Sequence, residues 1–219
     1  MTFFPKVIAS VLLMFAASAQ AAVVQYEDYL GAGGFVNALT GGPITHTFDA
    51  PSILDTAYGS SPFSVGPFLV VDGVKFTPNE SAFVLSTDTN NAYSVPFFAA
   101  QGGDPNVLSV SLTTGVTAIG FFYGSYNGES SSFSASVNNG AFVATGLSLP
   151  GTTNSTKFIG FTSILPITSI VFTQAATAGF DVITFVTGTA APVPEPSMAL
   201  MLGAGFAAIF TIVRRRQRV

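Results

Sequence analysis

The chain has 219 residues, of which 48% are hydrophobic and only 8% are charged, and it contains 22 Phe but no Trp and no Cys. The apolar content excludes a disordered chain, which needs low hydrophobicity and high charge. The missing Cys excludes disulfides, thiolate metal sites and Cys nucleophiles. The net charge of −4 is uneven, because residues 1–22 carry +1 (one Lys), residues 23–192 carry −8 (ten Asp/Glu, two Lys) and residues 193–219 carry +3 (four Arg, one Glu).

Residues 1–22 have the pattern of a secretory signal peptide. Lys6 is followed by an apolar stretch, residues 7–19, and then by Ala19-Gln20-Ala21, a small-x-small site of the kind that signal peptidase cuts. A buried N-terminal helix would need polar residues at helical spacing, and this stretch has only two serines. We therefore expect cleavage after Ala21 or Ala22.

Residues 23–186 have the pattern of an all-β domain. Apolar and β-branched runs recur about every 8 to 12 residues between Gly, Pro, Asn or Asp, and no segment keeps a helical period. Short strands in two packed antiparallel sheets, a β-sandwich, fit this spacing. The expected strands are 23–26, 45–49, 68–71, 74–77, 82–86, 93–98, 107–112, 116–123, 132–137, 141–144, 157–162, 167–173 and 180–186.

Turn residues mark two hairpins within this series. Asp72-Gly73 supplies the positive φ values of a type I′ turn, and Asn138-Asn139-Gly140 marks the second hairpin. Pro96 places its strand at a sheet edge or argues against a strand there. Alternation along the strands predicts inward faces for Phe133, Ala135 and Val137, for Ile170 and Phe172, and for Ile183 and Phe185 opposite Val182 and Thr184.

Beyond the last expected strand, residues 187–192 are small and read as a linker. Residues 198–213 then form a run of 16 residues without a charge, which as a helix is about 24 Å long, slightly short of a ~30 Å hydrocarbon core. Local thinning of the bilayer can accommodate that mismatch. We therefore predict one transmembrane helix over residues 198–213.

An arginine cluster follows this run directly. The positive-inside rule predicts that it stays in the cytoplasm as a membrane stop. A nucleic-acid patch is the alternative, but the acidic exported region disfavours it, so we expect no nucleic-acid partner. The cluster consists of Arg214, Arg215, Arg216 and Arg218.

The segment before the apolar run contains Pro194, Glu195 and Pro196. Pro-Glu-Pro, a short apolar helix and terminal arginines in this order resemble the PEP-CTERM sorting signal of Gram-negative bacteria, over residues 193–218. The resemblance implies recognition of Pro194, Glu195 and Pro196 by exosortase, a membrane-embedded peptidase or transpeptidase. It also implies an inner-membrane anchored intermediate that is then sent to the cell surface or extracellular matrix. An ordinary single-pass anchor is the alternative.

The stretch from Phe158 to Phe185 loosely resembles the last strands of jelly-roll ectodomains that are common with this tail. This resemblance implies a jelly-roll-like sandwich. The expected organisation is a signal peptide (1–22), a β-sandwich ectodomain (23–186), a linker (187–192) and the sorting signal (193–219).

The ectodomain offers little that resembles a catalytic site. His46 is the only His, so we expect no transition-metal site, and a half-buried strand histidine is favoured over a Ser-His-Asp triad. Nearly all ten acids lie in or beside expected turns, where Asp caps backbone groups. We therefore expect no enzyme and no cofactor. Calcium is possible, with Asp88-Thr89-Asn90-Asn91 as the nearest approach to a ligand run, although no ligands are assigned.

The segment from Phe121 to Glu129 combines aromatic, amide and carboxylate side chains, as sugar-binding β-sandwiches do. Tyr123, Tyr126 and Asn127 are the candidate glycan-binding residues, with a core role for Phe121 and Tyr123 as the alternative. The leading hypothesis is a structural or adhesive surface protein. The alternatives are a carbohydrate-binding module for extracellular polysaccharide and, less favoured, a hydrolase.

Overall fold

The computed structural model describes residues 23–48, 63–79, 81–85, 97–101, 105–125, 128, 130–153, 155–174 and 179–192. The expected signal peptide and the sorting signal lie outside these ranges. So do residues 93–96 of the strand expected at 93–98. Within them the chain forms twelve antiparallel strands and one short 3₁₀ helix. The prediction of an all-β, antiparallel fold is confirmed.

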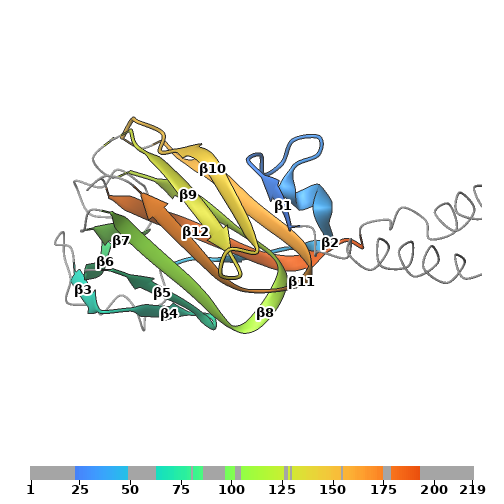
Figure 1. The fold of residues 1–219 in the computed structure, drawn as a ribbon, viewed down its shortest axis with the longest axis horizontal. Helices are drawn as coiled ribbons and strands as arrows, with labels where there is room; N and C mark the ends of the chain where they lie inside the picture. Colours follow the sequence, from blue (N-terminus) through green and yellow to red (C-terminus); the bar gives the residue numbers. More distant parts are fainter. Residues whose placement is uncertain are drawn as a thin grey trace, which may run out of the picture.

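Two long strands organise the molecule (Figure 1), β8 (Asn106–Gly124) and β11 (Lys157–Gln174). Residues 157–162 of β11 pair with one half of β8, and residues 169–174 pair with the other half, with an irregular register between them. The sequence predicted two strands in place of each of these. Gly115 and Pro166 interrupt the apolar pattern, but they mark bends at which the strands continue.

Each half of this bent pair builds one layer. The first layer contains β4 (Leu69–Val71), β5 (Val74–Pro78), residues 106–112 of β8, residues 167–174 of β11, β9 (Ser132–Val137) and β10 (Phe142–Ser148).

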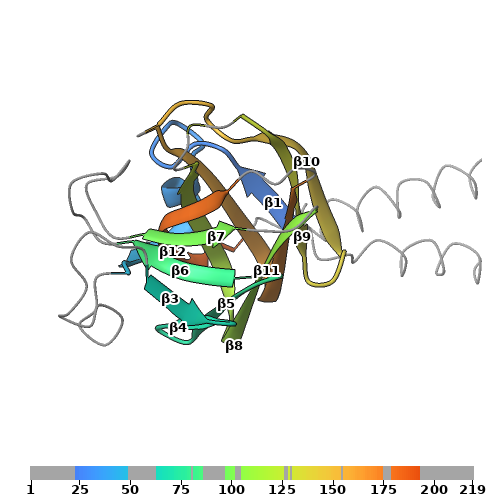
Figure 2. The same ribbon diagram turned by 90° about the vertical axis from the view of Figure 1, so that its left-hand side faces the viewer.

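The second layer contains β1 (Val23–Tyr26), the other halves of β11 and β8, and β12 (Phe180–Ala190). The edge of β12 that faces away from β8 pairs with β2 (Leu39–His46) and β7 (Phe97–Gln101), and the sheet continues through β6 (Ser81–Leu85) to β3 (Phe63–Gly66). Figure 2 shows β3, β6 and β7 side by side at this edge.

The main core lies between the two layers and is rich in Phe. Phe76 on β5 lies 5.3 Å from Phe185 on β12, and Phe172 on β11 lies 5.0 Å from Phe180 on β12, measured between ring centroids. These contacts join the layers, and they bury rings that each contribute a large apolar area. The two-layer arrangement is sandwich-like, as the strand spacing predicted.

Both predicted hairpin turns have the backbone that their residues favour. Asp72 and Gly73 have φ values of 49° and 80°, and Asn138, Asn139 and Gly140 have φ values of 50°, 57° and 92°. Asn, Asp and Gly tolerate the left-handed region better than other residues, so local chemistry fixes these turns.

The predicted inward faces are confirmed for β9 and for the second half of β11, where the five named residues are buried. On β12 the alternation is broken, because the register shifts between Val182 and Thr184 and both Val182 and Ile183 are buried.

The predicted linker is wrong in its first four residues. Strand β12 runs to Ala190, because residues 187–190 pair with β2 through Thr187↔Ile44 and Ala190↔Leu39. Backbone hydrogen bonds hold these small residues although their side chains add little packing. The strand predicted at 45–49 is β2, which starts earlier, at Leu39.

A second, smaller cluster covers the outer face of the second layer. The 3₁₀ helix η1 (Phe35–Ala38) brings the buried Phe35 ring to 5.3 Å from Phe158. Gly120 and Gly160 lie directly opposite each other below these rings. A Cβ on Gly160 would lie 2.4 Å from Phe35 Cδ2, and a Cβ on Gly120 would lie 2.4 Å from Phe158 Cζ, so a side chain at either position would force one of these rings to shift.

Candidate functional site

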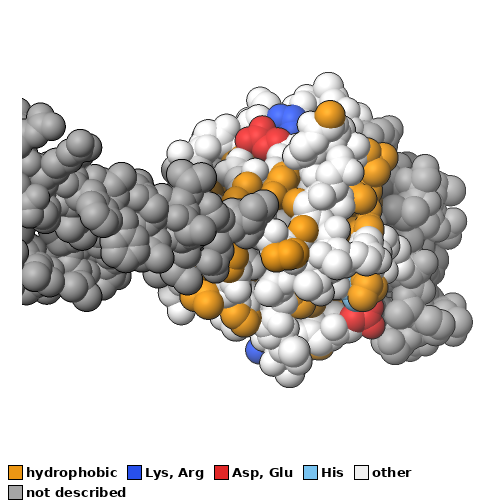
Figure 3. Space-filling view, turned by 90° about the vertical axis from the view of Figure 1, so that its right-hand side faces the viewer, with side chains coloured by type: hydrophobic (Ala, Val, Ile, Leu, Met, Phe, Trp, Pro, Cys, Tyr) orange, Lys and Arg blue, Asp and Glu red, His pale blue; other side chains and the backbone are white. Residues whose placement is uncertain are grey.

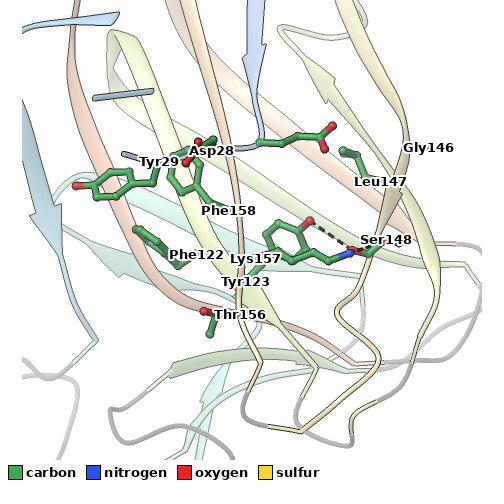
Figure 4. A pocket seen from close by; sticks show the side chains of 11 residues that line it. Asp28, Tyr29, Phe122, Tyr123, Gly146, Leu147, Ser148, Thr156, Lys157 and Phe158 are labelled. Atoms are coloured by element: carbon green, nitrogen blue, oxygen red, sulfur yellow. Dashed lines mark hydrogen bonds between the residues drawn. The ribbon is translucent and has the colours of Figure 1, made fainter. Parts of the chain in front are cut away.

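A pocket of about 470 Å³ opens beside this smaller cluster. It lies where the segment after β1 meets the end of β8, the end of β10 and the start of β11. Figure 4 shows the side chains that surround it. The lining residues are Glu27, Asp28, Tyr29, Phe122, Tyr123, Gly146, Leu147, Ser148, Thr156, Lys157 and Phe158.

One side of the pocket is aromatic. The rings of Tyr29, Phe122 and Phe158 form a triangle with centroid separations of 4.9 Å, 5.1 Å and 5.0 Å. Tilted and edge-on arrangements at such distances are favourable for aromatic pairs. Gly120 on β8 and Gly160 on β11 leave space for the Phe158 ring, so these two glycines allow the aromatic side of the pocket to form.

The other side is polar and is organised around Ser148. Lys157 Nζ donates to the Ser148 carbonyl oxygen at 3.0 Å and to its Oγ at 2.8 Å, and the Tyr123 hydroxyl donates to the same carbonyl at 3.4 Å (Figure 4). A lysine ammonium has three donors, so Lys157 is held in place by two of them and can direct the third at a ligand.

The two carboxylates differ in their local roles. Asp28 Oδ1 accepts from the backbone N–H groups of Leu30 and Gly31 at 3.2 Å and 3.0 Å, which is a turn-capping arrangement. Glu27 accepts at Oε1 from the Gln25 side-chain amide at 2.9 Å. Asp28 therefore stabilises the loop that carries Tyr29, whereas Glu27 supplies negative charge at the pocket.

Burial raises the pKa of Tyr123, and the negative charge of Glu27 raises it further. The hydroxyl is therefore neutral at physiological pH and acts as a hydrogen-bond donor. Tyr123 is only 3% exposed, and its ring stacks with Phe180 in the main core. The core role given as the alternative for this residue is therefore confirmed. Its hydroxyl lies at the pocket, and glycan binding by Tyr123 stays a prediction.

The sequence identified Tyr123 but missed the other polar members of the pocket. Tyr126, Asn127 and the run 88–91 lie outside the described residues, as do the sorting-motif prolines and glutamate and the four terminal arginines. Glu27 and Lys157 stand 130 residues apart in sequence, so only the β1–β11 pairing, Tyr26↔Gly160, brings their segments together. No local signal could have shown this.

His46 is a strand histidine, as predicted, with 12% of its side chain exposed. Its ring stacks on Phe185 at 4.5 Å, Nδ1 lies 2.8 Å from Asp72 Oδ2, and Nε2 lies 2.8 Å from Thr187 Oγ1. The order Asp-His-Thr has the hydrogen-bond pattern of a triad. Asp72 belongs to the β4–β5 turn and Thr187 to β12, so these bonds tie the two layers together.

No group of three or more His, Cys, Asp or Glu side chains suited to a metal ion occurs among the described residues. The same part of the chain contains no helix that is long and apolar enough to cross a membrane. The expected membrane helix at 198–213 and any calcium site outside these ranges stay predictions.

Comparison with known proteins identifies the C-terminal segment. The family model of the PEP-CTERM protein-sorting motif matches residues 192–217. This match confirms the resemblance that the sequence showed. No curated protein matches the chain.

Three solved structures are similar to parts of the chain at low identity. An exo-beta-1,3-galactanase from Phanerochaete chrysosporium, with galactose, has 9% identity and a TM-score of 0.34, covering 59% of this chain and 29% of that one. An Arthrobacter globiformis isomalto-dextranase, with panose, has 11% identity and a TM-score of 0.33, covering 76% and 34%. A variant of the family 29 carbohydrate-binding module CBM29-2, with mannohexaose, has 12% identity and a TM-score of 0.29, covering 78% and 93%. The chain thus spans about a third of each of the two enzymes.

Proposed function

We propose that this chain, which carries the PEP-CTERM protein-sorting motif, is an exported surface or matrix protein whose ectodomain has a structural or adhesive role and no catalytic one. The motif marks the protein for exosortase processing, with anchoring at the C-terminus before release. The ectodomain is a jelly-roll-like sandwich in this proposal, and its final location is the cell surface or the extracellular matrix.

The observation that carries the proposal is the match of residues 192–217 to the sorting motif, directly behind a folded β-domain that ends at Ala190. The first residue of the motif therefore follows the last strand almost immediately. A domain that exosortase releases in this way leaves the membrane already folded, which suits a surface or matrix component.

Replacing Glu195 by Ala in the native host tests the sorting step. In the sequence this carboxylate stands between two prolines, residues that favour the extended backbone which a peptidase recognises. The variant should remain in the membrane at its unprocessed mass. Glu27→Ala, which removes a carboxylate 168 residues before Glu195 in the sequence, is the matched control and should be processed normally. Unchanged processing and release of the Glu195 variant would refute exosortase handling.

A second candidate function is binding of extracellular polysaccharide, and the pocket geometry favours it. An aromatic wall of Tyr29, Phe122 and Phe158 stands beside a fixed ammonium, a neutral tyrosine hydroxyl and a carboxylate. Sugars present apolar C–H faces and hydroxyl edges, and such a combination matches both. The volume lies within the range of about 300–1,000 Å³ that is typical of small-ligand sites.

The two lysines of the ectodomain give a matched test of this second function. Lys157→Ala removes the pocket ammonium, whereas Lys75→Ala removes an equal charge on β5, where Lys75 Nζ lies 4.1 Å from the Phe68 ring centroid. Polysaccharide from the native host should bind the domain, and Lys157→Ala should weaken it about tenfold or more, the value of one charge-assisted hydrogen bond. Equal binding by the two variants would refute a role for the pocket.

A further inference from the structure

The bend of β11 presents two neighbouring apolar side chains to solvent. Ile164 is 60% exposed and Leu165 is 57% exposed, whereas Ser163 and Ile167 on either side are buried. We call residues 164–166 the β11 tip. Single exposed apolar residues are ordinary, but an adjacent pair at a projecting bend forms a small apolar surface that a partner can contact.

The β11 tip is held rigidly by its neighbours. Asn138, in the β9–β10 turn, donates from Nδ2 to the Pro166 carbonyl oxygen at 3.0 Å and accepts at Oδ1 from the Thr168 N–H at 2.9 Å. A Cβ on Gly115 would lie 2.7 Å from Pro166 Cβ, so the β8 bend packs closely behind the tip. A partner that binds this surface therefore needs to order little of it.

Strand register places the tip at the end of the molecule from which the chain continues to the sorting motif. Thr162 pairs with Ala118, Ala118 pairs with Gly188, and the N–H of Ala191 donates to the Ala38 carbonyl oxygen at 2.7 Å. The last residues of β12 and the β11 tip therefore lie at the same end of the second layer, on the right in Figure 1.

This end carries hydrophobic side chains among uncharged polar ones, and its charged side chains lie towards the margin (Figure 3). Glu27, Asp28 and Lys157 belong to the pocket, and Asp72 is engaged by His46. A charge-poor surface with projecting Ile and Leu side chains suits the boundary between lipid headgroups and acyl chains.

The connection between the domain and the apolar run is short, and this limits how far this end of the domain can lie from a membrane. Only five residues, 193–197, separate Pro192 from the apolar run that begins at Met198, and when fully extended they span at most about 18 Å. While residues 198–213 are in the membrane, the end of the domain that bears the β11 tip is thus kept close to the bilayer surface.

We propose that the β11 tip inserts Ile164 and Leu165 into the interfacial region of the lipid bilayer while the protein is anchored. This inference rests on the anchored stage of the proposed function. Contact with lipid would orient the domain on the membrane and hold the Pro-Glu-Pro segment near the surface, where a membrane-embedded peptidase can reach it. Release of the C-terminal helix removes the tether and ends the contact.

The absence of Cys makes a site-specific test possible. The full chain is reconstituted into phosphatidylcholine–phosphatidylglycerol vesicles as Ile164→Cys labelled with an environment-sensitive fluorophore. Ser132→Cys, exposed at the start of β9 at the opposite end of the domain, is the matched control. Vesicle flotation measures anchoring, and nitroxide groups on the lipid measure contact with the bilayer.

The label at position 164 should be quenched by lipid-borne nitroxide several times more than the label at 132. Leu165→Ser in the same background should reduce that quenching. Flotation without preferential quenching at 164 would overturn the proposal and leave the anchored stage intact, and failure to float would refute both. Protection of position 164 from aqueous iodide without lipid quenching would assign the tip to a second copy of the chain and also overturn the proposal.

Discussion

The glycine pair of the second layer gives the sharpest test of the packing. In Gly160→Ala the new Cβ would lie 2.4 Å from Phe35 Cδ2 and 2.8 Å from Phe158 Cε1. Neither ring can move aside easily, because Phe35 is fully buried and Phe158 contacts Tyr29 and Phe122 at about 5 Å. The variant must therefore displace an aromatic cluster or open the β8–β11 pairing.

Overpacking of this kind costs about 1–3 kcal/mol of the free energy of unfolding. For a domain of this size, that loss lowers the melting temperature by roughly 2–12 °C. Urea unfolding of residues 23–192, followed by tyrosine fluorescence in a chain without Trp, measures the change. In the double variant Gly160→Ala/Phe35→Ala the cost of the added methyl should be smaller, because the nearest ring is gone. An unfolding free energy for Gly160→Ala within about 0.5 kcal/mol of the parent would contradict the packing described here.

Three further predictions concern the turn, the buried tyrosine and the histidine. Asn138→Ala should lose about 1–3 kcal/mol in urea unfolding, because the backbone groups of Pro166 and Thr168 lose their partner and Ala disfavours the positive φ; Asn138→Gly, which relieves only the backbone, should lose less. The pKa of Tyr123 is raised in the folded state, so the stability that its neutral form contributes is present below about pH 10 and is lost as the pH rises above that value. The free energy of unfolding of Tyr123→Phe should therefore fall less between about pH 9 and 11 than that of the parent protein. His46→Ala should lower the free energy of unfolding by about 2–4 kcal/mol, from two hydrogen bonds and a stacked ring, and an unchanged urea midpoint would refute its role in joining the layers.

The features that the sequence predicted well depend on local chemistry. Asp72-Gly73 and Asn138-Asn139-Gly140 form turns because their residues accept positive φ, and the alternation of β9 is visible within six residues. The terminal sorting motif is likewise a contiguous pattern, and the family match confirms it.

The features that the sequence could not predict depend on which distant strands pair. Nothing near Gly115 or Pro166 says that the chain bends and continues as one strand, since continuity requires the other long strand as a partner. His46 finds Asp72 and Thr187 at sequence separations of 26 and 141 residues. The pocket has the same origin, because β1 must pair with β11 before Glu27 and Lys157 approach the same space.

In the proposed function, exosortase processing releases a folded β-domain from its C-terminal anchor. The intact mass of the protein recovered outside the native host's cells tests this release. We expect a chain that lacks residues 1–21 or 1–22 and ends before Met198, so that the apolar run and the four terminal arginines are absent. A released protein whose mass includes residues 198–219 would refute this processing.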